Sequence, residues 1–172
     1  MKSLLPGCAT IIAVVLAVSL AGKLRNFPEF VESIKALDFI PRRLVALTAV
    51  LIAAIESILF LMTATAPLGD RRTTMAAFAL SAMLFTVFGI VITISLSRGL
   101  AVRCHCFGRA RAAFSVRHVV RNGILVVIAL AGLATSASTG MVGVPETVIS
   151  IASGLFCAIF LIAMDDVSEL FA

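Results

Sequence analysis

Five long apolar stretches constrain this chain more than any other feature of its sequence. Each is close to the roughly 20 residues that a helix needs to cross the hydrocarbon core of a bilayer. The 172-residue chain is 61% hydrophobic and only 13% charged, which excludes an ordinary soluble domain and a disordered chain. The stretches cover residues 4–21, 44–66, 74–97, 119–137 and 144–164. We therefore predict an all-α integral membrane protein, with residues 1–172 forming a single transmembrane domain.

The predicted arrangement is a four-helix bundle with a fifth spanning helix beside it, and we expect the first helix to remain uncleaved. Between the first two spans, residues 27–39 combine apolar residues at three- and four-residue spacing with charged residues on the other face. The apolar set is Phe27, Phe30, Val31, Ile34 and Leu37, and the charged set is Glu29, Glu32, Lys35 and Asp38. This pattern predicts a short amphipathic helix lying in the membrane interface.

The basic residues are distributed unequally between the two predicted faces of the membrane. Lys2, Arg71 and Arg72 are the three on the face that bears the N-terminus, whereas the other face has eleven. Because cytoplasmic loops are enriched in Lys and Arg, this bias places the N-terminus outside, in a multi-pass protein of the cytoplasmic (inner) membrane. The net charge of +5 comes with no basic soluble module, so the expected partner is the lipid bilayer and not a nucleic acid.

Two charged residues in or near the spans stand out. Glu56 is the one acidic residue inside the second span, where an unpaired charge would cost about 2–3 kcal/mol. We expect Glu56 to face the bundle, as a proton carrier, a group that orients a quinone, or a structural hydrogen-bonding group. Lys23 and Arg25 end the first span and are interpreted as anchors that extend to the interface. The hydroxyl groups predicted to pair with Glu56 are those of Ser57, Thr86, Thr93 and Ser95.

The loop after the third span contains two thiols one residue apart, Cys104 and Cys106, with His105 between them. No acidic residue occurs from Arg71 through Pro145, while eight of the 14 cations do. Neighbouring guanidinium groups favour the thiolate, which is the reactive form of cysteine. The sequence therefore identifies this loop as the segment that carries the chemistry.

Four interpretations of the two thiols remain open at this point. A Cys104–Cys106 disulfide would close a small strained ring, and strained disulfides are the easily reduced, catalytic kind. A soft metal ion could use both sulfurs and His105, although such sites usually take further ligands from a distant segment. The thiols could also be unreactive small hydrophobic groups, or could each pair with a partner protein. Cys8 and Cys157 lie in apolar runs and are expected to be buried and inert.

Several of these motifs together resemble the MauE family of methylamine-utilisation membrane proteins, which is grouped with the DoxX-like redox-associated membrane proteins. The resemblance covers roughly residues 10–165. It rests on Ala21-Gly-Lys23-Leu24-Arg25 leading to Phe30, on Pro41 before the second span, on Glu56, and on Cys104-His105-Cys106-Phe107-Gly108 after the third span. The cysteine spacing differs from the Cys-x-x-Cys of DsbB-like and vitamin K epoxide reductase-like proteins.

The resemblance implies a role in maturing disulfide-rich periplasmic proteins during methylamine metabolism. By analogy, Cys104 and Cys106 would be the exchanging thiols, Phe107 and Gly108 would shape their loop, and Glu56 would be a buried polar helper. Lys23 belongs to the motif that supports the match, and no role transfers to His105. The implied partners are a thioredoxin-like, MauD-type protein and a client such as the small subunit of methylamine dehydrogenase.

The leading hypothesis is thus membrane thiol–disulfide exchange, and the sequence alone does not establish an enzyme. The alternative is a non-catalytic scaffold or assembly subunit of a larger complex, and a weaker one is a metal carrier that uses Cys104, His105 and Cys106. No cofactor is evident, although a quinone stays open as a candidate. The charge bias places the two cysteines in the cytoplasm, whereas a periplasmic client would require them to be reached from outside.

Overall fold

The computed structural model describes residues 4–37, 40–99, 115–136 and 143–169, the last six of these as backbone only. This part of the chain is all helical, which confirms the predicted fold class. Five of its helices are long and apolar enough to cross a membrane. The helices are α1 (Leu4–Arg25), α2 (Phe27–Lys35), α3 (Val45–Ala64), α4 (Arg71–Ser97), α5 (Val116–Ser136) and α6 (Val144–Glu169).

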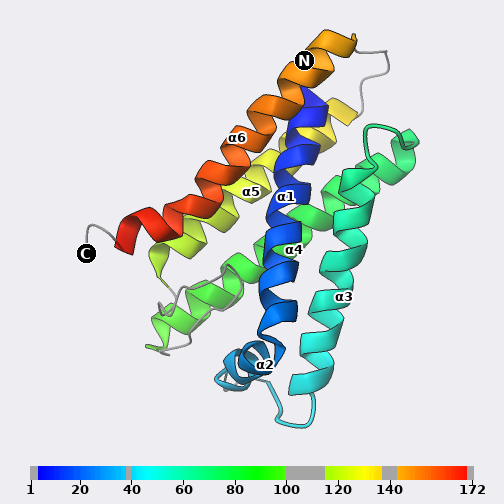
Figure 1. The fold of residues 1–172 in the computed structure, drawn as a ribbon. Helices are drawn as coiled ribbons and strands as arrows, with labels where there is room; N and C mark the ends of the chain where they lie inside the picture. Colours follow the sequence, from blue (N-terminus) through cyan, green and yellow to red (C-terminus); the bar gives the residue numbers. More distant parts are fainter. Residues whose placement is uncertain (1–3, 38–39, 100–114, 137–142, 170–172) are drawn as a thin grey trace.

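Helix α1 lies at the centre of the arrangement and packs against α3, α5 and α6 (Figure 1). Helix α4 packs along α5 and also contacts α3, so that α1, α3, α4 and α5 form the bundle. Helix α6 packs against α1, at the side of this bundle (Figure 1). This arrangement agrees with the predicted four-helix bundle with a fifth helix beside it.

Eight helix ends differ from the predicted boundaries, each by one to five residues. Helix α4 begins at Arg71 because Asp70 caps it, accepting the backbone N–H groups of Arg72 and Thr73. The Thr73 hydroxyl also donates to this carboxylate, and these hydrogen bonds lower the pKa of Asp70. Helix α1 continues to Arg25, and α2 ends at Lys35 before a turn in which the N–H of Leu37 bonds to the carbonyl of Ile34.

Helix α2 has the amphipathic character that its sequence predicts. Phe30 and Ile34 are buried against Val45 and Ala49 of α3, while the charged residues of α2 point outward. Helix α2 therefore covers the end of the molecule at which α1 ends and α3 begins (Figure 1). Because the chain crosses the bundle with each spanning helix, α4 ends and α5 begins at this same end.

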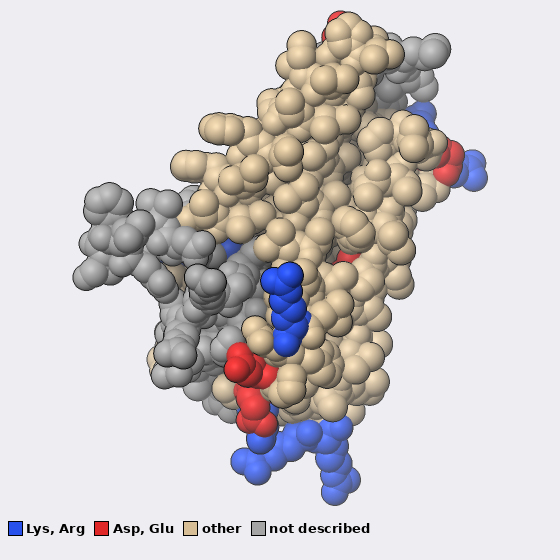
Figure 2. Space-filling model, viewed as in Figure 1, with Lys and Arg blue, Asp and Glu red and all other residues tan. Residues whose placement is uncertain are grey.

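The charged side chains follow this division. Figure 2 shows a broad tan surface along the helices, with most of the visible charged atoms at the end where α2 lies and a smaller group at the opposite end. Along the described spanning helices the exposed large side chains are mainly Leu, Ile, Val, Met and Phe. A surface of this kind is stable only in contact with hydrocarbon, as in a multi-pass membrane protein.

Small residues bring α1 and α6 into close contact. A Cβ atom on Gly154 would lie 2.6 Å from the carbonyl oxygen of Gly7, closer than real contacts allow. The N–H of Gly7 donates to the hydroxyl of Ser150 at 2.9 Å, one turn before Gly154. This is the way membrane helices associate, since small residues permit backbone contact and hydroxyl groups bond across the interface.

We predict that Gly154→Leu separates α6 from α1 and lowers the melting temperature of the purified protein in detergent. The added side chain would overlap the backbone of Gly7, and overpacking of this kind costs about 1–3 kcal/mol or more. Ala152→Leu, on an exposed position of the same helix, is the matched control and should leave the melting temperature unchanged. Equal melting temperatures for the two variants would contradict the α1–α6 contact.

Candidate functional site

The structure describes two of the predicted site residues, Lys23 and Glu56, and brings them together. The segment from Cys104 through Gly108, with His105 between the cysteines, lies outside the described residues. Of this loop the structure shows only where it is attached, because residues 100–114 connect the end of α4 to the start of α5. The candidate site that can be built from side chains is therefore centred on the Lys23–Glu56 pair.

Lys23 and Glu56 form an ion pair inside the bundle. The Lys23 Nζ atom lies 2.5 Å from Glu56 Oε1, and the side chains are 1% and 0% exposed. The ammonium also donates a hydrogen bond to the hydroxyl of Ser19 at 2.8 Å, and Ser19 lies 3.4 Å from the same carboxylate oxygen, to which it donates. Ammonium, hydroxyl and carboxylate thus form a closed group of three polar side chains.

Helix geometry explains why residues so far apart in sequence meet. Side chains on a helix tilt toward its N-terminus, so Lys23, near the end of α1, points back into the bundle and over Ser19 four residues earlier. Helix α3 runs antiparallel to α1 (Figure 1), so the side chain of Glu56 tilts in the opposite direction, toward Lys23. A residue near a helix end and a residue at mid-helix therefore meet within the bundle.

Aromatic rings from two further helices flank the ammonium. The centroids of Phe30 of α2 and Phe88 of α4 each lie 5.4 Å from Lys23 Nζ, a distance at which a cation is attracted to the face of a ring. Lys23 is thus in contact with side chains of α2, α3 and α4 while belonging to α1. One charged group links four helices at this point.

The carboxylate of Glu56 keeps one oxygen available. Its Oε2 atom is buried and has no hydrogen-bond partner among the described residues. A buried carboxylate oxygen of this kind can accept a hydrogen bond or take up a proton. The site therefore presents one buried acceptor oxygen, next to a positive charge and away from bulk water.

These contacts confirm one expectation and correct two. Glu56 faces the bundle and is paired, as predicted. The interpretation of Lys23 as an anchor that extends to the interface is wrong, because its ammonium turns inward to Glu56. The predicted hydroxyl partners of Glu56 are also wrong, because each donates to a carbonyl of its own helix at position i−4. These are Ser57, Thr86, Thr93 and Ser95.

Sequence reasoning did not identify Ser19 or Phe88 as part of this site. The spacing of Ser19 and Lys23, four residues apart on one predicted helix, was a usable signal because such residues lie on the same face. Phe88 had no comparable signal, since its contact with Lys23 depends on how α4 packs beside the other helices.

No group of three or more His, Cys, Asp or Glu side chains able to hold a metal ion occurs within the described residues. Cys157 is exposed on α6, and Cys8 of α1 is partly buried. The expectation that both are buried is therefore wrong for Cys157, which faces outward from its helix. The metal hypothesis for Cys104, His105 and Cys106 falls outside the described residues.

The comparisons with known proteins give one match. Residues 1–135 match a family model described as methylamine utilisation protein MauE. The match begins at the N-terminus, includes both members of the ion pair and the segment with the two cysteines, and stops near the end of α5. Helix α6 lies beyond it. The comparisons with curated proteins and with solved structures give no match.

We predict that removing one member of the ion pair is more damaging than removing both. Lys23→Met leaves a buried carboxylate without its countercharge, and Glu56→Gln leaves a buried ammonium, so each should lower the free energy of unfolding by about 3–5 kcal/mol. The double variant Lys23→Met/Glu56→Gln should recover most of this loss, because no unpaired charge remains. The measurement is unfolding in mixed micelles, analysed as a double-mutant cycle.

The control is the exposed pair on α2, Lys35 with Glu32, at 3.0 Å. Its Lys35→Met and Glu32→Gln variants should each change the free energy of unfolding by less than about 1 kcal/mol. Additive effects of the two buried substitutions would contradict a coupled pair inside the bundle.

Proposed function

The chain belongs to the MauE family of methylamine-utilisation proteins, and on this premise we propose that it is a membrane protein of thiol–disulfide exchange. The observation that carries the proposal is the extent of the family match, which includes both the buried Lys23–Glu56 pair and the Cys104-His105-Cys106 segment. In this proposal Cys104 and Cys106 are the exchanging thiols.

The proposed reaction has two balanced steps. The thiolate of Cys104 or Cys106 attacks a disulfide of the partner, forming a mixed disulfide and releasing the partner's other sulfur as a thiolate. The neighbouring cysteine, as its thiolate, then attacks the mixed disulfide. This second step forms the Cys104–Cys106 disulfide and releases the partner as a dithiol. The two steps also run in reverse, and the dithiol of the partner is then oxidised to a disulfide.

The proposed partners carry the chemistry that this exchange needs. A thioredoxin-like protein reduces or oxidises the cysteine pair by thiol–disulfide exchange. A disulfide-rich periplasmic protein, such as the small subunit of methylamine dehydrogenase, is the client. Both follow from the family resemblance. In this proposal the protein takes part in the maturation of secreted proteins during methylamine metabolism.

The position of the ion pair supports a role for Glu56 as the proton carrier of this exchange. Phe88 contacts Lys23 and lies nine residues before Ser97, the last residue of α4, which corresponds to about 13 Å along the helix. The cysteine-bearing segment begins just beyond this end. A thiol must lose its proton before it attacks, and Glu56 Oε2 is a buried acceptor of the required kind.

The proposed orientation places the end that bears α2 in the cytoplasm. The basis is the excess of Lys and Arg at that end, which is ten against three when the inward-turned Lys23 is left out. With a periplasmic client, the thiols would then transfer electrons across the bilayer, or would be reached from the far side through the bundle.

We predict that the two thiols form a reducible disulfide in intact cells. In a Cys8→Ser/Cys157→Ser background, a maleimide that cannot cross membranes should label Cys104 and Cys106 only after reduction and lysis, which matches the proposed orientation. Labelling of intact cells after reduction alone would reverse the orientation and keep the exchange chemistry. Thiols labelled fully without reductant would argue against the exchange.

We also predict that single cysteine variants trap the partner. With Cys104→Ser or Cys106→Ser, the mixed disulfide lacks its resolving thiol and should accumulate as a covalent complex that reductant dissolves. The double variant should form no such complex and should leave periplasmic client proteins under-oxidised on diagonal gels. A partner that co-purifies equally well with the double variant, while client disulfides stay intact, would favour the scaffold hypothesis instead.

A further inference from the structure

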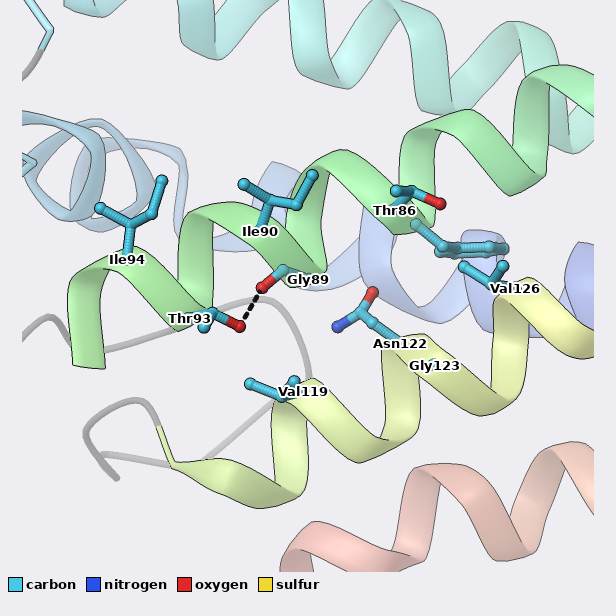
Figure 3. A pocket seen from close by; sticks show the side chains of 10 residues that line it. Thr86, Gly89, Ile90, Thr93, Ile94, Val119, Asn122, Gly123 and Val126 are labelled. Atoms are coloured by element: carbon cyan, nitrogen blue, oxygen red, sulfur yellow. Dashed lines mark hydrogen bonds between the residues drawn. The ribbon is translucent and has the colours of Figure 1, made fainter. Parts of the chain in front are cut away.

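A groove between α4 and α5 opens onto the surface of the spanning helices (Figure 3). It encloses about 400 Å³ and runs from Phe85 and Val126 to Ile94 and Val119. Gly89 and Gly123 leave its floor open, since neither contributes a side chain. Exposed residues such as Ile90 and Thr93 form its rim, so a molecule in the groove would also be in contact with the bilayer.

One polar group in this groove lacks a partner. Asn122 of α5 is 6% exposed, and Figure 3 shows its carboxamide projecting toward Gly89 of α4. Its Nδ2 donates to the carbonyl of His118 at 2.8 Å, whereas its Oδ1 accepts no hydrogen bond from any described residue. This amide oxygen is therefore available to accept a hydrogen bond from a molecule that enters the groove.

The depth of Asn122 restricts what could pair with it. Asn122 is six residues into α5, about 9 Å from the start of the helix. The acyl chains of a phospholipid carry no donor, and its headgroup stays at the bilayer surface. A polar group on a largely apolar, membrane-soluble molecule can supply this donor while the rest of the molecule lies against the apolar walls.

We propose that the groove binds a membrane-soluble quinol, with a ring hydroxyl donating to Asn122 Oδ1 and the hydrocarbon chain lying along the apolar walls. The hydroxyl satisfies the carboxamide oxygen, and Phe85 provides an aromatic surface at the deep end of the groove. The oxidised quinone has only carbonyl acceptors on its ring, so the site binds the reduced form more tightly.

The groove is placed to serve the cysteines, and this part of the inference rests on the proposed function. Ile94 lies three residues before the end of α4, and Val119 three residues after the start of α5. The groove therefore ends within one turn of both attachments of the segment that carries Cys104 and Cys106. Oxidation of this dithiol to a disulfide releases two electrons and two protons, and reduction of a quinone to the quinol takes up both.

The test measures binding of a benzoquinol with a decyl chain to the full-length protein in lipid nanodiscs, by calorimetry without oxygen. Asn122→Leu removes the acceptor while keeping the bulk. Gly123→Leu fills the groove, and a Cβ at this position has no atom within 4 Å, so the fold should tolerate it. Val127→Leu, 66% exposed on the same helix and away from the groove, is the control.

The expected result is that Asn122→Leu and Gly123→Leu each weaken quinol binding about tenfold or more, while Val127→Leu binds as the unmodified protein does. The quinone with the same chain should bind about tenfold more weakly than the quinol. Unchanged binding in both groove variants, or a preference for the quinone, would overturn the site. A dimer that Gly123→Leu dissociates, with no quinol bound, would assign the groove to a neighbouring helix instead.

The binding site and the proposed function can fail separately. Cys104→Ser/Cys106→Ser should bind the quinol with unchanged affinity, because the described residues that line the groove provide the acceptor and the apolar walls without them. If client disulfides form equally well without Cys104 and Cys106, the exchange function is refuted and the quinol site is not affected. If quinol binding does not depend on Asn122, the quinol site is refuted, and the exchange function is still tested by the cysteine variants.

Discussion

A buried ammonium–carboxylate pair is the interaction on which the rest of this structure depends. Neither Lys23 nor Glu56 reaches water, and in the low dielectric of a membrane protein each charge is tolerable only beside the other. The pair fixes α1 against α3, and the rings of Phe30 and Phe88 around the ammonium draw α2 and α4 to the same point. Four helices must be correctly placed before either charge is satisfied, so the pair makes their positions interdependent.

Two acceptor oxygens within the described helices have consequences for function. Glu56 Oε2 is a buried acceptor in the interior, and Asn122 Oδ1 is an acceptor in the groove between α4 and α5. Among the described residues, these two oxygens are acceptors that a proton or a hydroxyl-bearing ligand can use. Helix α6 contributes to neither and packs on α1 through Gly7 and Gly154.

Much of the fold could be predicted from the sequence because membranes impose strict length and polarity requirements. Five apolar stretches correspond to the five spanning helices. The pattern of residues 27–39 predicts an amphipathic helix, which the structure has at residues 27–35 with Phe30 and Ile34 buried. The helix ends were less predictable, since Asp70 as a cap and Arg25 as the last residue of α1 depend on local hydrogen bonds and not on hydropathy. The candidate site was predicted only in part. The sequence predicts that Glu56 is paired, but the hydroxyl groups predicted as its partners bond within their own helices.

What the sequence by itself determined is the class of protein, the number of spanning helices and the requirement that a charge within a span be neutralised. These follow from the free energy of placing residues in hydrocarbon, which depends on composition along the chain. Only the tertiary structure decided which residues meet. Lys23 at a helix end has the same sequence signal whether it extends to the interface or turns inward. Its direction is set by the antiparallel packing of α3, which brings Glu56 within reach, because contacts between distant residues depend on how helices pack.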